Sequence, residues 1–357
     1  MGTIQIGRRK IGSGEKLYFI ADIAANHDGD MTRALNLIEL AKESGADAAK
    51  FQNFKAEKIV SRYGFETMGR QLSHQAGWKK SVFEVYQEAS LSDEWIPQLK
   101  EKCDEVGIDY FTSPYDFESV DLVDPFLDVY KIGSGDITWL EILDYIARKG
   151  KPVILSTGAS TMADVQRAIA VLMPHINDII LMQCNTNYTA SLDNFRHINL
   201  NVLRTFRQHY PNLVLGLSDH THGHATILGA VALGACVFEK HFTDDNRREG
   251  PDHKFAMNPA SWKEMVTLAN ECYQALGDGI KRVEANEVET ALLQRRALRF
   301  TKDLPQGHVL QQGDLFPLRP IPEDGIPPYE IGSMIGRSLV RDVKNDDYLK
   351  RGDLLSC

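Results

Sequence analysis

The most constraining feature of this sequence is a regular alternation of short apolar segments and longer amphipathic segments between about residues 17 and 276. The longer segments have helical periodicity, as in residues 32–45, where apolar side chains recur every three or four positions. Each short apolar run is nearly continuous, as expected for a strand that is buried on both faces. Eight such runs begin at Leu17, Ala46, Ile108, Asp128, Pro152, Asp178, Leu213 and Cys236.

Eight strand-then-helix units of this length predict an α/β fold, a (β/α)8 TIM barrel. The main alternative is a doubly wound open sheet, which more often carries a glycine-rich phosphate-binding turn after its first strand. The first turn here instead reads NHDGD, over residues 26–30. A longer connection, residues 55–91, follows the second run. In a barrel it would lie over the C-terminal mouth, where substrates bind.

The character of the sequence changes after residue 276. Residues 277–293 are charged and helix-prone, which is typical of a linker. Two similar stretches follow, residues 304–315 and 343–354. They predict a small β-rich module with internal pseudo-symmetry and, because it is so small, little core of its own. The predicted domains are a barrel over residues 1–276 with residues 1–15 as an N-terminal extension, a linker over 277–293 and the β-rich module over 294–357.

Charge and apolar content exclude several classes of partner. With 40 Lys and Arg against 49 Asp and Glu the net charge is −9, which argues against a general nucleic-acid-binding protein. No run approaches the roughly 18 apolar residues of a membrane span, and the first residues lack the apolar run of a signal peptide. The five cysteines have no metal-site spacing and suit a reducing compartment. We therefore expect a cytoplasmic protein with neither a nucleic-acid nor a membrane partner.

Polar residues stand near the C-terminal ends of six of the predicted strands. In a (β/α)8 barrel these positions meet in one cavity. A single polar residue near a strand end is common, because loops are close by. Six of them on different strands indicate a site. They are Asp22, Lys50, Lys131, Ser156, His220 and His241.

His220 and His241 end neighbouring strands, the seventh and the eighth. Imidazoles on adjacent strand tips, roughly 5 Å apart, can bind one divalent metal ion and leave positions open for water or substrate. The alternative for this pair is a hydrogen-bonded structural role.

A cationic patch rich in hydroxyl groups is expected beside the histidines. Lysines and serines supply charge-assisted hydrogen bonds from several directions, which suits a phosphate or a carboxylate better than a neutral sugar. A lysine could instead form a Schiff base, as in an aldolase, with Lys131 or Lys50 as the nucleophile. The patch comprises Lys50, Lys131, Ser113, Ser134, Ser156 and Ser218.

Several segments, all in barrel order, resemble the sialic acid (N-acetylneuraminate) synthase family. They are ADIAANHDGD, GADAAKFQ, YFTSPYD, YKIGSGD, VILSTGAS, GLSDHT, EKHFT and GPDH. The similarity extends through residues 294–357, which resemble the family's antifreeze-like (SAF) domain. The resemblance implies an enzyme that condenses phosphoenolpyruvate with an open-chain 2-acetamido hexose, forms a nine-carbon ulosonic acid and releases phosphate.

The resemblance also implies a role for each matching residue. His220 and His241 match ligands of a Mn²⁺ or Mg²⁺ ion, and Asp22 matches a catalytic carboxylate. Arg319 matches an arginine that the SAF domain inserts into the partner subunit's site, which implies a domain-swapped homodimer. The positions that match the phosphoenolpyruvate shell are Lys50, Ser113, Lys131, Ser134, Ser156, Thr186 and Ser218. Those that match sugar contacts are Gln52, Tyr188, Asp252 and Arg319.

Several positions depart from the family's usual pattern. Asp22 and Asp136 stand where the family commonly has Glu, which retracts each carboxylate by about 1.5 Å. Ala24 replaces a Gly, and Thr186 replaces an Asn. Residues 73–80, where the family contacts the N-acetyl sugar, lack a clear counterpart of its asparagine.

These departures predict a synthase that acts on a sugar other than N-acetylmannosamine. The candidates are 2,4-diacetamido-6-deoxy hexoses, which lead to legionaminic or pseudaminic acids. The alternative from a different functional class is a non-catalytic sugar-binding relative that keeps the synthase scaffold.

Overall fold

The computed structural model describes residues 2–68, 75–76 and 78–355. Contacts divide the chain into two compact units, Met1–Leu276 and Gly277–Cys357. No helix in the described parts of the chain combines the length and apolar character that a membrane crossing requires.

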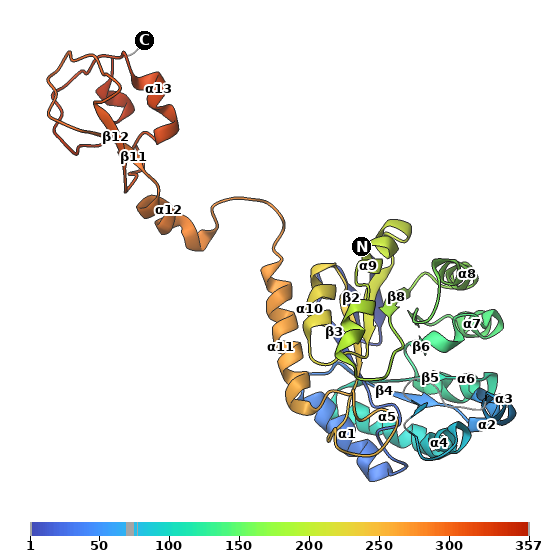
Figure 1. The fold of residues 1–357 in the computed structure, drawn as a ribbon. Helices are drawn as coiled ribbons and strands as arrows, with labels where there is room; N and C mark the ends of the chain where they lie inside the picture. Colours follow the sequence, from blue (N-terminus) through green and yellow to red (C-terminus); the bar gives the residue numbers. More distant parts are fainter. Residues whose placement is uncertain (1, 69–74, 77, 356–357) are drawn as a thin grey trace. The chain divides into compact units, whose positions relative to one another are not determined.

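The first unit is built on a nearly closed barrel of parallel strands (Figure 1). Its strands are β3 Tyr18–Asp22, β4 Ala48–Asn53, β5 Asp109–Pro114, β6 Tyr130–Ile132, β7 Val153–Ser156, β8 Ile179–Cys184, β9 Val214–Asp219 and β10 Val237–His241. The hydrogen-bonded order is β5-β4-β3-β10-β9-β8-β7-β6, and the two end strands, β5 and β6, also contact each other. Each of the eight predicted strands is confirmed, and the barrel rather than the open sheet is the fold.

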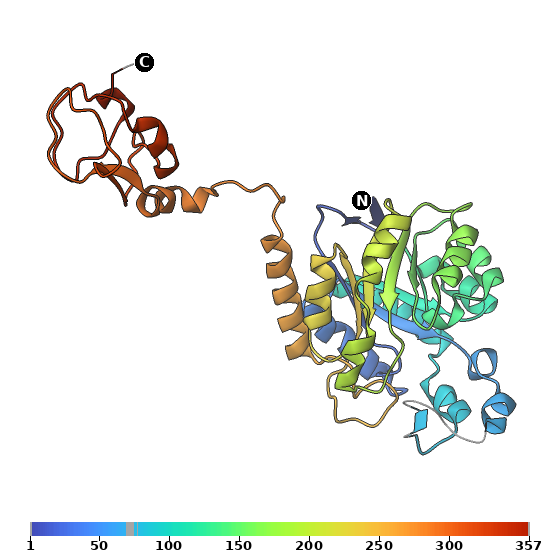
Figure 2. The same cartoon turned by 45° about the horizontal axis from the view of Figure 1, so that its top comes forward.

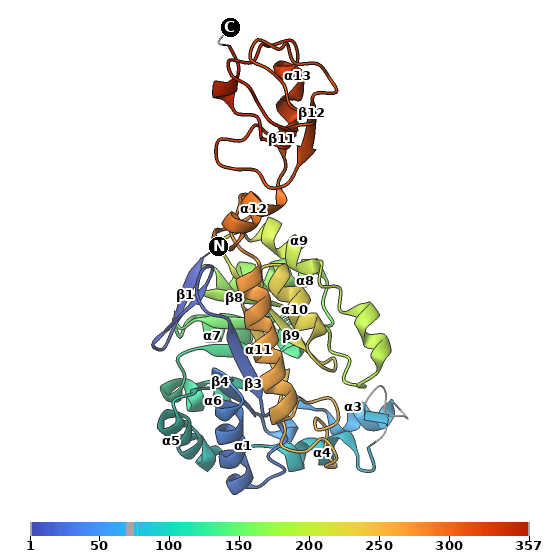
Figure 3. The ribbon, with the colours of Figure 1, turned by 90° about the vertical axis from the view of Figure 1, so that its left-hand side faces the viewer.

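Each barrel strand is followed by a helix that covers the outer side of the barrel, and after β4 this helix comes behind a longer connection (Figure 1). Local sequence fixes the helix ends. The Asp30 side chain accepts hydrogen bonds from the backbone N–H groups of Thr32 and Arg33 at the first helix, and Gly107 ends the second in a left-handed conformation. The helices are α1 Met31–Glu43, α5 Ile96–Val106, α6 Phe117–Val123, α7 Leu140–Ala147, α8 Met162–Leu172, α9 Val202–His209, α10 Ala225–Ala232 and α11 Pro259–Ala275. Their apolar faces join the strands in one core, and α11 packs against both α10 and α1 (Figure 3).

The long connection after β4 forms three short helices, α2 Ala56–Ile59, α3 Arg62–Thr67 and α4 Val82–Ala89. In Figure 2 this excursion, in light blue to cyan, lies at the opposite end of the barrel from the N-terminus. Its predicted position at the C-terminal mouth is confirmed. The expectation about residues 73–80 falls partly on residues 73, 74 and 77, which lie outside the described residues.

The residues before the barrel form an antiparallel hairpin, β1 Thr3–Ile6 and β2 Arg9–Gly12, where the sequence indicated only an extension. Its isoleucines are buried and belong to the barrel core. The backbone N–H of Gly2 donates to the carbonyl of Asn212, just before β9, over 3.1 Å. The hairpin therefore packs at the N-terminal ends of the strands, opposite the mouth.

The second unit contains α12 Val288–Gln294, β11 Ala297–Phe300, β12 Leu315–Leu318 and α13 Ile331–Met334. Leu304 and Val343, which begin the two similar stretches, exchange backbone hydrogen bonds of 3.0 and 2.9 Å, so equivalent positions of the two stretches lie side by side. The expectation of little core was wrong, because the loops of this unit fold over a cluster of eleven buried apolar residues. They are Leu298, Phe300, Leu304, Leu310, Leu315, Ile326, Met334, Leu339, Val343, Leu349 and Leu354.

Candidate active site

The candidate site begins where β9 and β10 end side by side. Ser218 and Glu239 are register partners on these strands, and the Ser218 hydroxyl donates to Glu239 Oε1 over 3.1 Å. His220 directly follows the last residue of β9, and His241 is the last residue of β10, so each stands two positions beyond Ser218 or Glu239. Because side chains alternate along a strand, residues two positions apart face the same side, and all four line one cavity.

Thirteen of the fourteen predicted site residues line one cavity of about 410 Å³ at the C-terminal mouth. They come from the ends of all eight barrel strands or from the loops that follow them. The fourteenth, Arg319, belongs to the second unit, where it is exposed. The thirteen are Asp22, Lys50, Gln52, Ser113, Lys131, Ser134, Ser156, Thr186, Tyr188, Ser218, His220, His241 and Asp252.

Two buried lysines share carboxylate partners in this cavity. Lys50 Nζ lies 2.7 Å from Asp22 Oδ2 and 3.9 Å from Glu239 Oε2. Lys131 Nζ donates to Ser156 Oγ over 2.8 Å and lies 3.4 Å from Glu239 Oε1. Burial lowers the pKa of both lysines, but at Lys50 the two carboxylates outweigh burial and raise the pKa above its ordinary value. An anion entering the cavity therefore meets at least one protonated lysine.

The two histidines lie close enough to share a metal ion, with ring centroids 5.4 Å apart. His220 Nδ1 lies 2.8 Å from the backbone carbonyl oxygen of Asn185, which can only accept. The proton is therefore on Nδ1, and Nε2 carries the lone pair. Burial lowers the pKa of both imidazoles, which favours the neutral form that a metal ion binds.

The histidine pair fits a divalent metal ion. Nδ1 of His241 is buried and has no hydrogen-bond partner among the described residues. Within that same part of the chain, no three His, Cys, Asp or Glu side chains are placed to enclose a metal ion. An ion held here would have two protein ligands and open positions for water and substrate.

The part of the cavity beside the histidines suits a sugar. Asp252 Oδ2 lies 3.8 Å from His241 Nδ1 and accepts a hydrogen bond from the backbone N–H of Ala25 over 3.4 Å. Burial is the main reason that the pKa of Asp252 rises to about 7. The ring centroid of Tyr188 lies 4.2 Å from that of His220. The connection after β4 adds an apolar and aromatic wall, made of Phe54, Ile59, Val60, Phe65, Trp78, Val85, Tyr86 and Ala89.

Comparison with known proteins decides the family. The model of the NeuB family matches residues 37–281, more than half of the chain, and the model of the SAF domain matches residues 295–355. The chain belongs to the NeuB family. It is 35% identical over 340 residues to an N,N'-diacetyllegionaminic acid synthase of Campylobacter jejuni, covering 94% of this chain and 99% of that protein. It is 30% identical over 353 residues to a pseudaminic acid synthase of the same species, with 98% and 99% covered.

Solved structures of relatives have the same fold. An N-acetylneuraminic acid synthetase from Leptospira borgpetersenii, solved with citrate, matches 81% of this chain and 94% of its own with a TM-score of 0.71 at 28% identity. A spore coat polysaccharide biosynthesis protein from Bacillus subtilis matches all of both chains with a TM-score of 0.66 at 30% identity. The family resemblance drawn from the sequence motifs is confirmed.

Sequence reasoning missed one central carboxylate of this NeuB-family site. Glu239 contacts Lys50, Lys131 and Ser218, yet it was not among the predicted residues. It stands two positions before His241 in the EKHFT segment, so the alternation of a strand could have identified it. Tyr86 and Tyr115 also line the cavity. Tyr115 lies in the YFTSPYD segment, two positions after Ser113, whereas no pattern in the sequence marks Tyr86.

Asp136 predicts a measurable dependence of stability on pH. Burial raises the pKa of this carboxyl from 3.8 to about 6. Between about pH 4 and 6 the folded protein holds a proton that the unfolded chain has lost, so this group makes stability fall as pH rises. Asp136→Asn removes the titration. We expect the variant to gain about 1–3 kcal/mol relative to the unmodified protein between pH 4.5 and 7.5, measured by urea unfolding. A difference that does not change with pH contradicts the shifted pKa.

Ala24 holds a left-handed backbone conformation in the loop after β3, with φ of 45°. This conformation costs a residue with a side chain about 1–2 kcal/mol, whereas glycine adopts it freely at an entropic cost of roughly 0.5–1 kcal/mol. We expect Ala24→Gly to raise the midpoint of thermal unfolding by about 1–3 °C. Ala25→Gly is the matched control and should lower the midpoint. Equal shifts in the two variants would rule out backbone strain at Ala24.

Proposed function

We propose that this chain is a phosphoenolpyruvate-dependent nonulosonic acid synthase. It condenses phosphoenolpyruvate with an open-chain 2-acetamido hexose to a nine-carbon acid and releases phosphate. The observation that carries the proposal is a single cavity in which two lysines and several hydroxyl groups adjoin a histidine pair and a buried carboxylate. The names of its relatives, legionaminic and pseudaminic acid synthases, support the same reaction class.

The lysines and hydroxyl groups bind the phosphate and carboxylate of phosphoenolpyruvate. Lys50 supplies a full positive charge, and the Lys131–Ser156 hydrogen bond fixes a second donor beside it. Charge-assisted donors that converge from several strands orient the enol phosphate more firmly than one contact could. The proposed shell consists of Lys50, Ser113, Lys131, Ser134, Ser156, Thr186 and Ser218.

His220 and His241 hold Mn²⁺ or Mg²⁺, which when bound acts as a Lewis acid that polarises the sugar aldehyde. Gln52, Tyr188 and Asp252 bind the sugar. C3 of phosphoenolpyruvate forms the new bond to the aldehyde carbon, water adds at C2, and phosphate leaves with cleavage of its C–O bond. The former aldehyde oxygen takes up one proton, and the water that adds at C2 releases one. We assign to Asp22 the uptake of the proton that this water releases; its Oδ2 lies 2.7 Å from Lys50 Nζ and 3.5 Å from His241 Nε2.

The acceptor we favour is a 2,4-diacetamido-6-deoxy hexose rather than N-acetylmannosamine. Such a sugar carries three methyl groups, two on acetamido groups and one at C6. The wall from the connection after β4 offers apolar and aromatic surface to cover them. Asp22 and Thr186 are also shorter than the residues usual in the family, which changes the space available beside the acceptor.

The deciding experiment measures inorganic phosphate released from phosphoenolpyruvate with Mn²⁺, across a panel of 2-acetamido and 2,4-diacetamido hexoses. We expect release with a diacetamido sugar, little with N-acetylmannosamine, and none after a chelator is added. Reactions without sugar control for simple hydrolysis. If protein with Mn²⁺ bound releases no phosphate with any sugar of the panel, that result contradicts the synthase. The remaining hypothesis is then a non-catalytic sugar-binding protein.

A Schiff-base aldolase on the same barrel is the second candidate. The lowered pKa of Lys131 favours it, because a neutral amine is the nucleophile in such enzymes. Borohydride treatment in the presence of pyruvate and the active sugar separates the two functions. The synthase leaves the protein mass unchanged, whereas an aldolase gains a covalent adduct on Lys131 or Lys50.

We propose further that the enzyme is a cytoplasmic homodimer in which Arg319 serves the partner subunit's site. Arg319 is exposed beside the exposed apolar residues Phe316 and Leu318, which suits a contact surface. Mixing inactive His241→Gln and Arg319→Ala chains tests this arrangement. Random exchange makes half of the dimers mixed. In a mixed dimer, the barrel that keeps His241 receives Arg319 from its partner and is intact, whereas the other barrel lacks both side chains. Activity should therefore return to about a quarter of that of the unmodified protein.

A further inference from the structure

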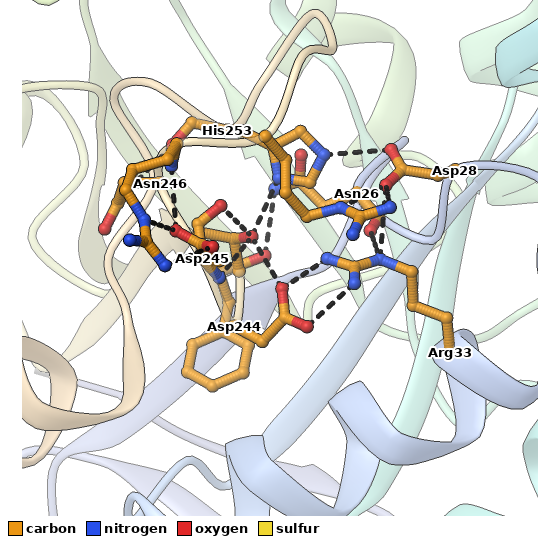
Figure 4. A network of polar contacts seen from close by, with 11 residues as sticks. Asn26, Asp28, Arg33, Asp244, Asp245, Asn246 and His253 are labelled. Carbon is orange, nitrogen blue, oxygen red and sulfur yellow. Dashed lines mark hydrogen bonds and ion pairs between the residues drawn. The ribbon is translucent and has the colours of Figure 1, made fainter.

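A partly buried polar network connects the loop after β3, residues 23–30, to the loop after β10, residues 242–258 (Figure 4). Arg33, on α1, connects them. Its Nε donates to the carbonyl oxygen of Asn26 over 2.7 Å, and its Nη1 donates to Asp244 Oδ2 over 2.7 Å. The Asn26 side chain in turn donates to the carbonyl of Phe242 over 2.9 Å.

A second tie runs parallel to the first. His253 is fully buried, and its Nε2 lies 2.9 Å from Asp28 Oδ1 while its Nδ1 lies 2.8 Å from the Thr243 hydroxyl. Since an ionised carboxylate only accepts, Nε2 carries the proton and Nδ1 accepts from Thr243. The ring has little freedom, because a Cβ on Gly250 would lie 2.7 Å from its Cδ2.

Both sets of hydrogen bonds involve residues that are adjacent in sequence to residues of the active site. Asp252 precedes His253, and Ala25 precedes Asn26. The hydrogen bond from Ala25 N–H to Asp252 Oδ2 joins the two loops inside the cavity. Ala25 and Asp252 line the cavity, whereas the lining does not include Asn26, Asp28, Arg33, Asp244 or His253.

We propose that Arg33, Asp244, Asp28 and His253 are positioning residues of the synthase, which hold Asp252 where it binds the acceptor sugar. This inference rests on the proposed function. Asp252 stands on a long loop, and both Ala24 and Asp28 of the facing loop have positive φ, so the facing backbone is held in a strained form. A displacement of about 1 Å at such a site costs up to about 100-fold in rate.

The test compares Arg33→Met and Gly250→Ala with a control in the same loop. Arg33→Met removes the tie to Asp244, and Gly250→Ala displaces the His253 ring while leaving every hydrogen-bonding group in place. Arg247→Met is the control, because Arg247 pairs with Asp245 of its own loop over 2.9 Å and its side chain is 90% exposed. Initial rates are measured with the active sugar of the panel and with phosphoenolpyruvate varied separately.

We expect Arg33→Met and Gly250→Ala to raise the KM for the sugar about tenfold or more, with the KM for phosphoenolpyruvate within about twofold. Arg247→Met should leave both constants unchanged. A general loosening of the barrel would raise both KM values together, and that result overturns the proposal. So does an unchanged KM for the sugar in both variants.

Hydrogen exchange separates this inference from the proposed function. In Arg33→Met, amide exchange should become faster in residues 23–30 and 242–258 and stay unchanged in α8. If the unmodified protein releases no phosphate with any sugar, the proposed function fails, and exchange still decides whether the network holds the two loops. If amide exchange is unchanged in both loops, the contacts of Arg33 do not hold the loops together.

Discussion

Replacing Asp22 with asparagine is expected to lower kcat for phosphate release by about 1,000-fold or more, the scale of a lost proton-transfer group. Asp22 Oδ2 contacts Lys50 at 2.7 Å and His241 at 3.5 Å, and its Oδ1 is buried without a hydrogen-bond partner among the described residues. Asparagine keeps the shape of the side chain but carries no charge and cannot take up the proton. The result is measured with saturating Mn²⁺, phosphoenolpyruvate and sugar.

The same change also affects stability, and a matched variant separates the two effects. Asp22→Asn leaves Lys50 buried with Glu239 at 3.9 Å as its remaining carboxylate, and breaking a buried pair typically costs about 3–5 kcal/mol. Asp219 and Lys240 form an equally buried ion pair on β9 and β10, on the faces that do not line the cavity. Asp219→Asn should therefore destabilise the barrel by a similar amount while kcat stays within a few-fold. Equal loss of kcat in both variants would mean that folding, and not Asp22, explains the effect.

The barrel could be predicted because parallel strands buried on both faces leave continuous apolar runs in the sequence. The N-terminal hairpin is a different case. Ile4, Ile6 and Ile11 alternate with polar residues around Gly7, which is a weak but readable hairpin pattern, yet nothing in it says that the hairpin packs on the barrel. The core of the second unit was underestimated because burial by folded loops has no sequence period.

The candidate site could be predicted from residue type and position, because strand ends in a barrel converge. What could not be predicted is the set of contacts that cross the fold. Asp28 and His253 are 225 residues apart, and each alone is an ordinary loop residue. The shared contacts of Glu239 with both lysines likewise follow from the barrel's curvature. Sequence therefore indicates which groups face the cavity, while their pairing and their pKa values need the structure.

Substitution of either histidine is expected to abolish both metal binding and turnover. Loss of a partner that only orients a metal ligand already weakens binding about 10–100-fold, so loss of one of two protein ligands should weaken Mn²⁺ binding by about 100-fold or more. A Lewis acid contributes several kcal/mol to such a reaction, which corresponds to roughly 1,000-fold in kcat. His241→Gln and His220→Gln are measured by calorimetric titration with Mn²⁺ and by phosphate release.

His222 provides the matched control for this prediction, because it lies in the same SDHTHGH segment as His220 but outside the cavity. It is exposed, and its Nε2 lies 3.0 Å from the carbonyl of Ala190. His222→Gln should bind Mn²⁺ and turn over as the unmodified protein does. If His241→Gln and His220→Gln keep their affinity for Mn²⁺, the pair has the hydrogen-bonded structural role instead. Nδ1 of His241 has no hydrogen-bond partner among the described residues, and this argues against that outcome, since a purely structural buried histidine would have both ring nitrogens hydrogen bonded.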